Sequence, residues 1–487
     1  MLLTVDIGTT NFKTALWDFD GNRLAFVSRT LSVSDNFEIN PSVWLIAFDE
    51  CCNELRGLLE THTLKAGNLK DVKAIVISGN GPTLVPVFNE YHENNFLNYF
   101  SLCDSKARLW LDRRAVKYQD EISEVMGGYV DASFFLPKIF YIKHEENKLY
   151  NKTKFFLGCP EYLGFVLTGK AYNVFPSAGF DRWFWNESVL DKLNLSTSKF
   201  PLFIKPGDQF GMLLPFAAQK FGLTQEIPVI SGGPDFYASL LGSGVTEQGQ
   251  VCDRTGSSDG VNLCTLDKIK DKNLMSYGHP VKPFWNLSGF INTTGKAIDW
   301  ACDLLGVKKF DDFIALAKNS KSGSGGVLFL PYLAGERTLH GETSAVWSAL
   351  TLGKGRSEIA NSVLEGIGFA IKDVLSVMEK AFSKEHKHNM QTEFTVTNMR
   401  VTGGLAACPY LNQIKADITG LEILEGVHKE AELLGLAIIG SCSLGKFNSY
   451  PEASSAFYRI EKRYEPNPDN KKLYDDMFSE YLSLKRG

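Results

Sequence analysis

The sequence predicts an α/β protein made of two similar lobes, and three observations support this prediction. The chain has 487 residues, which is too long for one ordinary hydrophobic core. Strand patterns alternate with helical patterns along its length. The order of strand, glycine-containing turn and strand at the start recurs in the second half, as a match of pattern and not of residue identity. Two related halves with a cleft between them are the simplest interpretation.

The first half opens on a predicted β-meander. Residues 2–7 are a short apolar run around a single Asp, "TALW" resumes the strand pattern, and the Asp-Gly step at 20–21 predicts a tight hairpin turn. Residues 42–62 then carry apolar side chains at helical spacing. The stretch "VKAIVISGNGPTLVPVF" follows, and it predicts a buried strand, a Gly-Pro turn and another strand.

The second half repeats this order. "GQVCDRTGSSDGVNLCTL" predicts strand, turn and strand, and "RVTGGLAACPYLNQIKADITG" predicts a strand, a Gly-Gly turn and a helix. Glycine and polar residues cluster at 242–250, so we place a boundary there and expect domains of residues 1–244 and 245–487. The C-terminal segment predicts a proline-containing link into an amphipathic last helix.

Composition excludes several classes of protein. The formal net charge of -5 provides no general basic field for nucleic acid or an anionic membrane. The N-terminus enters a strand pattern at once, so we expect no signal peptide. "LLGLAIIGSCSLG", from Leu433, is too short to span a bilayer and predicts a packed helix. Nine cysteines without a C-x-x-C pair predict reduced thiols in a cytoplasmic protein, and neither a disulfide framework nor a zinc site.

Two hydroxyl-rich turns are candidates for phosphate binding. In "DIGTT" the glycine lets a ligand approach the backbone, and Thr9 and Thr10 add hydroxyl donors. Lys13 adds a positive charge within reach, and Asp6 could hold a divalent cation through water. A plain hairpin with a polar bend would also explain this turn. The matching "TGSS" at 255–258 favours the functional interpretation, because two such turns could hold a polyphosphate between them.

A single carboxylate follows the strand in "VISGGPDFYASLLGSG". Asp235 comes directly after Gly-Gly-Pro and begins a helix of small residues. It could simply cap that helix. It could also act as a general base, because an alcohol that attacks phosphorus must lose its proton to a group within hydrogen-bond reach.

Three further motifs each allow two interpretations. "TGGLAACPYLNQIKAD" suits a flat ring lying against the backbone, or plain strand-to-helix packing. "ARLWLDRRA", residues 107–115, offers Trp110 and Asp112 to a polyol, or forms a salt-bridged surface with a half-buried indole. The Glu-Arg-Thr of "LPYLAGERTLHGE" fits an interlobe network as well as a ligand site, and His340 fits a structural histidine.

Taken together, these motifs resemble the FGGY family of carbohydrate kinases, and within it the xylulose kinase-like group. The resemblance covers nearly the whole chain. Each motif alone is weak, but their order and spacing are specific. The motifs that carry it include "DIGTTNFK", "ISGNG", "WLDRRA", "SGGPDFYASLLGSG", "TGSS", "VLEGIGFAIKD" and "TGGLAACPYLNQIKADITG".

The resemblance implies a fold, ligands and partners. The implied fold is α/β, with two ribonuclease-H-like lobes of the actin-like ATPase type and a deep interlobe cleft. The first lobe would hold mainly the sugar, the second mainly ATP, and closure would bring them together. ATP and Mg²⁺ are the implied cofactors, and a small-molecule sugar is the implied partner. Neither nucleic acid nor a membrane is implied, and a homodimer is possible.

The resemblance also implies three sets of functional residues, carried over position by position. Asp235 matches the catalytic base, and Asp6 and Asp235 match the metal-binding positions. The ATP-binding set is Thr9, Thr10, Lys13, Gly256, Ser257, Ser258, Gly403, Gly404 and Cys408. The substrate-binding set is Asn80, Gly81, Trp110, Asp112 and Asp235.

The chain departs from the family pattern mainly at the sugar. Where xylulose kinases usually read Ser-Gly-Gln-Met-His-Gly, residues 78–83 read Ser-Gly-Asn-Gly-Pro-Thr and lack the histidine. Gly81 and Pro82 also replace the Arg-Glu pair of glycerol kinases, which disfavours glycerol. The stretch "SAGFDRWFWN", residues 177–186, adds unusual aromatics that could reshape the pocket. Leu405 replaces the usual third glycine of the adenosine loop, which leaves the nucleotide preference open.

We therefore expect an ATP-dependent kinase that phosphorylates a hydroxyl of a ketopentose similar to D-xylulose. The altered "GNGPT" keeps a second interpretation open, in which the substrate is another ketose, a polyol or a sugar acid. A third interpretation is a non-catalytic, actin-like nucleotide clamp, because fold alone does not fix function. The presence of Asp235 argues against the clamp.

Overall fold

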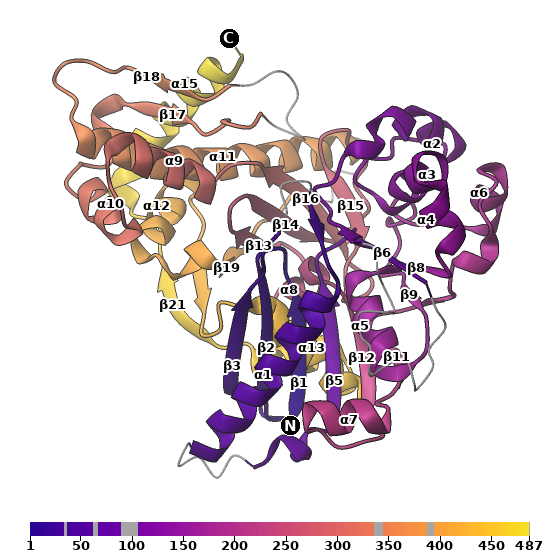
Figure 1. Cartoon of the computed structure of the whole chain (residues 1–487). Helices are drawn as coiled ribbons and strands as arrows, with labels where there is room; N and C mark the ends of the chain where they lie inside the picture. Colours follow the sequence, from indigo (N-terminus) through magenta and orange to yellow (C-terminus); the bar gives the residue numbers. More distant parts are fainter. Residues whose placement is uncertain (34–36, 62–66, 89–105, 336–343, 387–393, 487) are drawn as a thin grey trace. The chain divides into compact units, whose positions relative to one another are not determined.

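Figure 1 shows the computed structural model of the chain. The structure describes residues 1–33, 37–61, 67–88, 106–335, 344–386 and 394–486. The Glu-Arg-Thr at 336–338, His340 and Cys103 therefore lie outside the described residues. Contacts divide the chain into two compact units. Unit 1 comprises Met1–Gly242 and Glu432–Phe457, and unit 2 comprises Ser243–Ala431 and Tyr458–Gly487.

Unit 1 is built on a six-stranded mixed sheet with the order β11-β12-β5-β1-β2-β3. The predicted meander is confirmed, because β1, β2 and β3 pair antiparallel in sequence. On the other side of β1, β5 and then β12 join in parallel, and β11 closes the edge antiparallel to β12. The strands are β1 (Leu2–Ile7), β2 (Asn11–Trp17), β3 (Arg23–Thr30), β5 (Ala74–Gly79), β11 (Gln209–Met212) and β12 (Pro228–Pro234).

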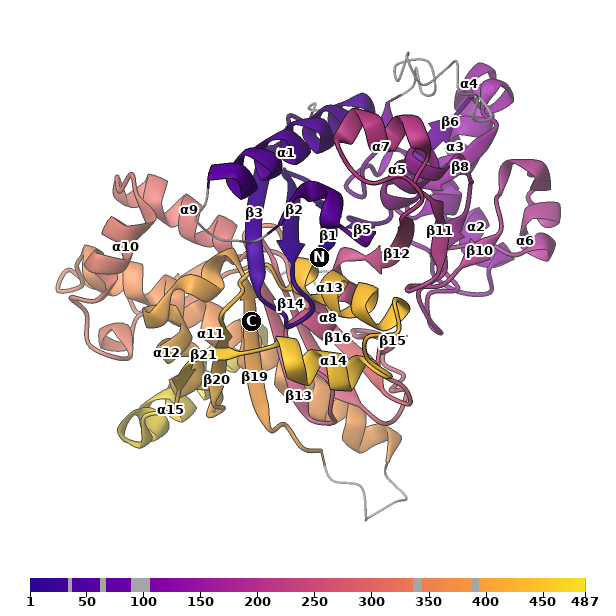
Figure 2. The ribbon, with the colours of Figure 1, turned by 90° about the horizontal axis from the view of Figure 1, so that it is seen from below.

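Helices cover both faces of this sheet, so that β1 and β5 are buried along their full length. One face carries α1 (Ser42–Thr61), α5 (Cys159–Thr168) and α7 (Pro215–Phe221), whose apolar residues share a core with the strands. The other face carries α8 (Asp235–Gly242) and α13 (Ala431–Ser443), followed by α14 (Tyr450–Phe457). Figure 2 shows α1 and α7 on one side of the strands and α13 on the other.

A smaller layer extends from the same unit. It is a four-stranded sheet in the order β4-β7-β6-β8, accompanied by a two-stranded pair, β9 and β10. Its strands are β4 (Glu38–Ile39), β6 (Leu84–Val87), β7 (Ala107–Arg108), β8 (Phe155–Gly158), β9 (Asn173–Val174) and β10 (Phe203–Ile204). Its helices are α2 (Gln119–Val125), α3 (Phe135–Glu145), α4 (Asn147–Lys152) and α6 (Glu187–Lys192).

Unit 2 repeats the strand arrangement of unit 1. Its sheet has the order β15-β16-β14-β13-β19-β20-β21, and β13 pairs antiparallel with β14 and parallel with β19, as β1 does with β2 and β5. An antiparallel strand, β21, again closes the edge. The predicted relation between the halves is therefore present in the topology. The strands are β13 (Gln250–Thr255), β14 (Asp259–Thr265), β15 (Met275–Gly278), β16 (Trp285–Ile291), β19 (Asn398–Gly403), β20 (Ile423–Gly426) and β21 (Ile460–Tyr464).

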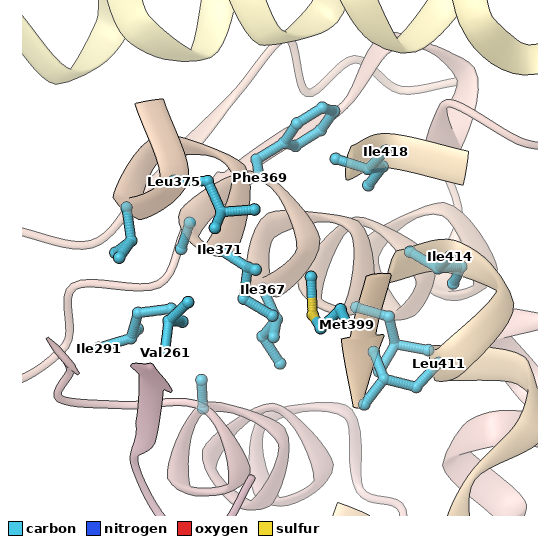
Figure 3. Close-up of a cluster of buried hydrophobic side chains, with 14 of the residues drawn as sticks. Val261, Ile291, Ile367, Phe369, Ile371, Leu375, Met399, Leu411, Ile414 and Ile418 are labelled. Atoms are coloured by element: carbon cyan, nitrogen blue, oxygen red, sulfur yellow. The ribbon is translucent and has the colours of Figure 1, made fainter. Parts of the chain in front are cut away.

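The core of unit 2 forms around the 30-residue helix α11 (Arg356–Glu385). Figure 3 shows Ile367, Ile371 and Leu375 of this helix among apolar side chains of the sheet and of α12 (Pro409–Thr419). The last helix, α15 (Lys471–Arg486), contacts α11, because the Tyr474 hydroxyl donates to the buried Glu365 carboxylate at 2.8 Å. The remaining elements include α9 (Gly295–Leu305), α10 (Phe310–Ala317) and the pair β17 (Leu328–Leu330) and β18 (Val346–Ser348).

One segment crosses back from unit 2 to unit 1. We predicted 245–487 as a contiguous second domain, whereas residues 432–457 pack with unit 1. The physical reason is a close helix contact, because a Cβ at Gly435 would lie 1.9 Å from the Ala238 carbonyl oxygen of α8. The apolar pattern predicted the packed helix α13 correctly but carried no information on its partner. Within the described part of the chain, we find no helix both long and apolar enough to cross a membrane.

The contact between α8 and α13 yields a first prediction. Gly435→Ala should destabilise unit 1 by roughly 1–3 kcal/mol, because the new methyl group overpacks against the α8 backbone. Gly57→Ala on α1 is the matched control, since no atom lies within 4 Å of the position that its Cβ would take. The control should be neutral or stabilising by up to about 1 kcal/mol. Urea unfolding measures both, and equal midpoints would contradict the close packing.

Candidate active site

The carboxyl ends of three parallel strands in unit 1 meet at one edge of the sheet. Asp6 on β1 lies beside Ser78 on β5, and Ser78 in turn lies beside Gly233 on β12. Two residues after Gly233, Asp235 begins α8. The strand register therefore brings the predicted metal residue Asp6 and the predicted base Asp235 into one neighbourhood.

Asp6 is a buried acid in a cluster of charges. It is 3% exposed and accepts a hydrogen bond from the Ser78 hydroxyl at 3.0 Å. Burial raises the pKa of Asp6 to about 7; the negative charges of Glu432 and Asp235 add to this rise, and the Lys13 ammonium opposes it. Such a raised pKa is typical of a functional carboxylate, although structural networks produce it too.

Glu432 is a member of this cluster that sequence reasoning missed. It lies on α13 and forms an ion pair with Lys13, the predicted phosphate ligand on β2. The two residues are 419 positions apart. No short motif predicts such a pair, and only the acidic residue at the start of an apolar helix could have drawn attention to it.

The residues present fit a divalent cation. Asp6, Asp235 and Glu432 bring three carboxylates to one ammonium, so a bound cation would compensate their negative charge. Among the described residues, no group of three or more His, Cys, Asp or Glu side chains is placed to bind a metal directly. Mg²⁺ commonly keeps several waters and takes only one or two carboxylates, which agrees with the predicted binding through water.

The first hydroxyl-rich turn connects two predicted sets of residues. The Gly8 amide donates to the Asn11 carbonyl at 3.0 Å and closes the turn. The Trp110 indole N–H, from the predicted substrate set, donates to the Thr9 hydroxyl at 2.8 Å. Thr10 is exposed at the tip of the turn. A residue predicted to contact sugar thus orients a residue predicted to contact phosphate.

Asp235 is half-buried at the first position of α8. One of its carboxylate oxygens accepts the Phe236 amide at 2.6 Å, which orients the side chain at the helix start. The preceding Gly233 has a φ of +75°, and a Cβ there would lie 2.9 Å from Pro206. The glycine is therefore required by the backbone path that presents Asp235. Orienting the helix start and acting as a base are compatible roles.

Asn80 and Asp112, which are both predicted to bind substrate, also have protein partners. The Asn80 amide donates to the Ile7 carbonyl at 2.8 Å and accepts from the Thr83 hydroxyl. Asp112 pairs with the Arg114 guanidinium at 2.6 Å. Burial alone would raise the pKa of Asp112, but the hydrogen bonds from Arg114 hold it below its usual range. The salt-bridged interpretation therefore describes Asp112 well.

Lys138 joins the two loops that carry these residues. It is 3% exposed, and its ammonium donates to the carbonyls of Pro82 at 2.7 Å and Leu109 at 2.6 Å. Burial lowers the pKa of Lys138 to about 7. Sequence reasoning missed this residue, although a lysine inside the apolar stretch "FLPKIFYI" was a usable signal.

The second hydroxyl-rich turn lies in unit 2, between β13 and β14. The Gly256 amide donates to the Asp259 carboxylate at 3.2 Å, and the Thr294 hydroxyl donates to the same oxygen at 2.8 Å. Ser257 and Ser258 are exposed. Burial raises the pKa of Asp259 to about 7, and the nearby Asp253 adds to the rise. The buried Asp259 carboxylate thus holds the backbone of the turn, while the side chains of Ser257 and Ser258 stay exposed.

The paired glycines at the end of β19 lie beside this turn. Gly403 has a φ of +90°, and a Cβ there would lie 2.1 Å from the Thr255 carbonyl oxygen. A Cβ at Gly404, by contrast, would have no atom within 4 Å. Cys408, also predicted to bind ATP, is 6% exposed. Burial raises the pKa of its thiol.

Comparisons with known proteins agree with these observations. The family model of the N-terminal domain of the FGGY family of carbohydrate kinases matches residues 1–242, and that of the C-terminal domain matches residues 254–444. A xylulose kinase from Staphylococcus epidermidis is 26% identical, and the alignment covers 99% of this chain and 96% of the relative.

Solved structures show the same fold. A gluconate kinase from Lactobacillus acidophilus superposes with a TM-score of 0.83 at 21% identity, covering 100% of this chain and 97% of that one. A ligand-bound xylulose kinase from the same organism gives a TM-score of 0.81 at 21% identity, with coverage of 100% and 98%. The actin-like α/β fold that the motifs implied is therefore confirmed.

The buried Asp6 yields a prediction about stability and pH. Its pKa is about 7 in the folded chain and about 3.9 in an unfolded one. Between these two pKa values, the Asp6 carboxyl is ionised in the unfolded chain but still protonated in the folded one. The free energy of unfolding therefore falls as pH rises through this window. Asp6→Asn should flatten that dependence and, at about pH 8, stabilise the fold by on the order of 1 kcal/mol or more. Urea unfolding across this range, with the exposed Asp191→Asn as control, tests it; an unchanged slope would contradict the raised pKa.

The paired glycines yield a prediction that separates fold from ligand binding. Gly403→Ala should destabilise unit 2, because its methyl group meets the β13 backbone and its φ is unfavourable. Gly404→Ala should change stability by less than about 0.5 kcal/mol, yet raise the KM for ATP if nucleotide lies against it. Thermal unfolding and steady-state kinetics measure these effects. An unchanged KM for ATP in Gly404→Ala would remove Gly404 from the nucleotide site.

Proposed function

Because the chain belongs to the FGGY family of carbohydrate kinases, and is therefore a sugar kinase, we propose that it transfers the γ-phosphoryl group of ATP to a hydroxyl of a ketopentose similar to D-xylulose. The observation that carries this proposal is Asp235 at the end of β12, in the same neighbourhood as the buried Asp6. The relative with 26% identity across nearly the whole chain, a xylulose kinase, supports the substrate.

Asp235 is the proposed general base. A sugar hydroxyl must lose its proton as its oxygen attacks phosphorus, and a half-buried carboxylate within hydrogen-bond reach can accept that proton. The Phe236 amide holds one carboxylate oxygen, which fixes the direction of the side chain. Most of the rate enhancement comes from such positioning, because phosphoryl transfer needs little covalent chemistry from the protein.

The charged phosphates are assigned to the two turns. Lys13 and the hydroxyls of Thr9 and Thr10 are the proposed ligands in unit 1, and Ser257 and Ser258 are the proposed ligands in unit 2. Asp6 and Asp235 are the proposed ligands of Mg²⁺, with Glu432 nearby. When bound, Mg²⁺ neutralises charge on the phosphates. Glu432 holds the Lys13 ammonium in the same cluster.

A different acceptor remains the main alternative. Residues 78–83 lack the histidine usual in xylulose kinases, which motivates another ketose, a polyol or a sugar acid. Solved structures of a gluconate kinase and a xylulose kinase share this fold almost equally, so the fold does not separate these substrates. The non-catalytic clamp is disfavoured by the placement of Asp235 beside Asp6.

The substrate is tested by ADP release from the purified protein with ATP and Mg²⁺, against D-xylulose, D-ribulose, polyols, hexoses and gluconate. Stimulation by either pentulose supports the proposed acceptor. Stimulation by another compound alone keeps the reaction and replaces the acceptor. Bound ATP without stimulation by any compound would overturn the proposal in favour of the clamp.

Asp235→Asn tests the proposed base. We expect kcat to fall by about 10²- to 10⁴-fold, the usual contribution of a general base, while the Kd of ATP stays within about twofold. Asp191→Asn, at an exposed position on α6, serves as a control with near-wild-type kcat. Steady-state kinetics and nucleotide titration give both numbers. Near-wild-type turnover in Asp235→Asn would refute the assignment.

A further inference from the structure

The aromatic stretch at 177–186 separates into two groups in the structure. Phe184 and Trp185 are buried against Phe203, with ring centroids 5.4 and 5.3 Å away. Phe180 and Trp183 instead pack against Phe236, the residue directly after Asp235. Only the second group therefore lies next to the proposed base.

Trp183 stands between the base and the loop that carries Gly81. Its ring centroid is 6.3 Å from that of Phe236, and a Cβ at Gly81 would lie 3.9 Å from one of its ring carbons. Phe180, fully buried, stacks on Phe236 at 5.7 Å with 25° between the planes. Phe134 supports Trp183 from another side, at 5.0 Å. Trp183 and Phe236 are themselves only half-buried.

Two basic side chains near this surface, Lys138 and Arg114, are engaged by other protein groups. Lys138, which lies against the same loop, donates its ammonium hydrogens to backbone carbonyls. Arg114 pairs with Asp112 and with Glu38. A carboxylate on an acceptor beside Trp183 and Phe236 would therefore meet ring faces.

We propose that Trp183 and Phe236 form an aromatic wall of the acceptor site that selects a neutral polyhydroxylated acceptor with an exposed C–H face. This inference rests on the proposed function and adds to it the residues that select the class of acceptor. An aromatic face carries negative potential, so it attracts the polarised C–H groups of a sugar and disfavours a carboxylate that would lose water there. Trp183 is a specificity-determining residue in this site, and the wall selects neutral sugars against sugar acids.

Trp183→Ala tests the wall directly, using whichever neutral acceptor stimulates the wild-type protein most. We expect its KM to rise about tenfold, equivalent to the loss of roughly one ring contact, with kcat changed by less than about threefold. Trp183→Phe should recover most of the affinity. The matched control is Trp185→Phe, a buried tryptophan of the same segment in the other group, whose KM should stay within about twofold.

Trp183→Lys tests the selection against charge. The ratio of kcat/KM for gluconate to kcat/KM for the neutral acceptor should rise at least about tenfold, because a cation replaces the negative ring face. Affinity is measured apart from turnover in the Asp235→Asn variant, by monitoring tryptophan fluorescence as the acceptor is added. The same titration is repeated with the double variant that also carries Trp183→Phe. Thermal unfolding of each variant identifies a loss of fold.

The outcomes separate this inference from the proposed function. If no acceptor stimulates ADP release by the wild-type protein, both the proposed function and the proposed aromatic wall are wrong. If a neutral acceptor is turned over but its KM is unchanged in folded Trp183→Ala, the function stands and the wall is overturned. A wild-type preference for gluconate over every neutral acceptor would also overturn the wall while keeping the kinase.

Discussion

Three strands, β1, β5 and β12, pair in parallel with a register that sets Asp6, Ser78 and Gly233 side by side. The candidate groups on these strands and directly after them depend on this pairing, because parallel strands bring their carboxyl ends to one edge of a sheet. The turn after β1, the loop after β5 and the helix after β12 all start from that edge. A slip of one residue in any strand would turn these side chains to the opposite face. The buried strands on both sides of β1 therefore position the chemistry as well as forming the core.

Both units place a buried acid next to a hydroxyl-rich turn, with different residues in each unit. Each hydroxyl-rich turn lies over a buried acid, Asp6 in unit 1 and Asp259 in unit 2, and in both cases burial raises the pKa. Each acid has a lysine in its cluster, Lys13 in the first case and Lys415, which pairs with Asp253, in the second. Burying charge is unfavourable for folding unless it is compensated. Such clusters persist where a site needs fixed charges, which agrees with their position beneath turns proposed to bind phosphate.

Local sequence patterns predicted the helices, strands and turns, but not the contacts between residues that are far apart in the sequence. The meander, the Gly-Gly turn before α12 and the helix beginning at Asp235 all follow from periodicity and turn residues within short windows. The ion pair of Lys13 with Glu432 does not, because its members are 419 positions apart. Nor could the sequence show that Asp112 pairs with Arg114, because that ion pair depends on the geometry of the loop. The sequence also did not predict which unit α13 packs against, because an apolar helix fits any apolar surface of suitable shape.

The return of residues 432–457 to unit 1 has a consequence for how the chain is made. A ribosome releases β1 first, yet one face of that strand belongs against α13, where a Cβ at Gly440 would lie 3.4 Å from the Leu2 side chain. That face stays without its natural cover until more than four hundred residues have been synthesised. Domains usually fold as units from the N-terminus onward, but here the first unit must wait for the second to be almost complete. Until then, the growing chain exposes apolar surface that the folded unit buries.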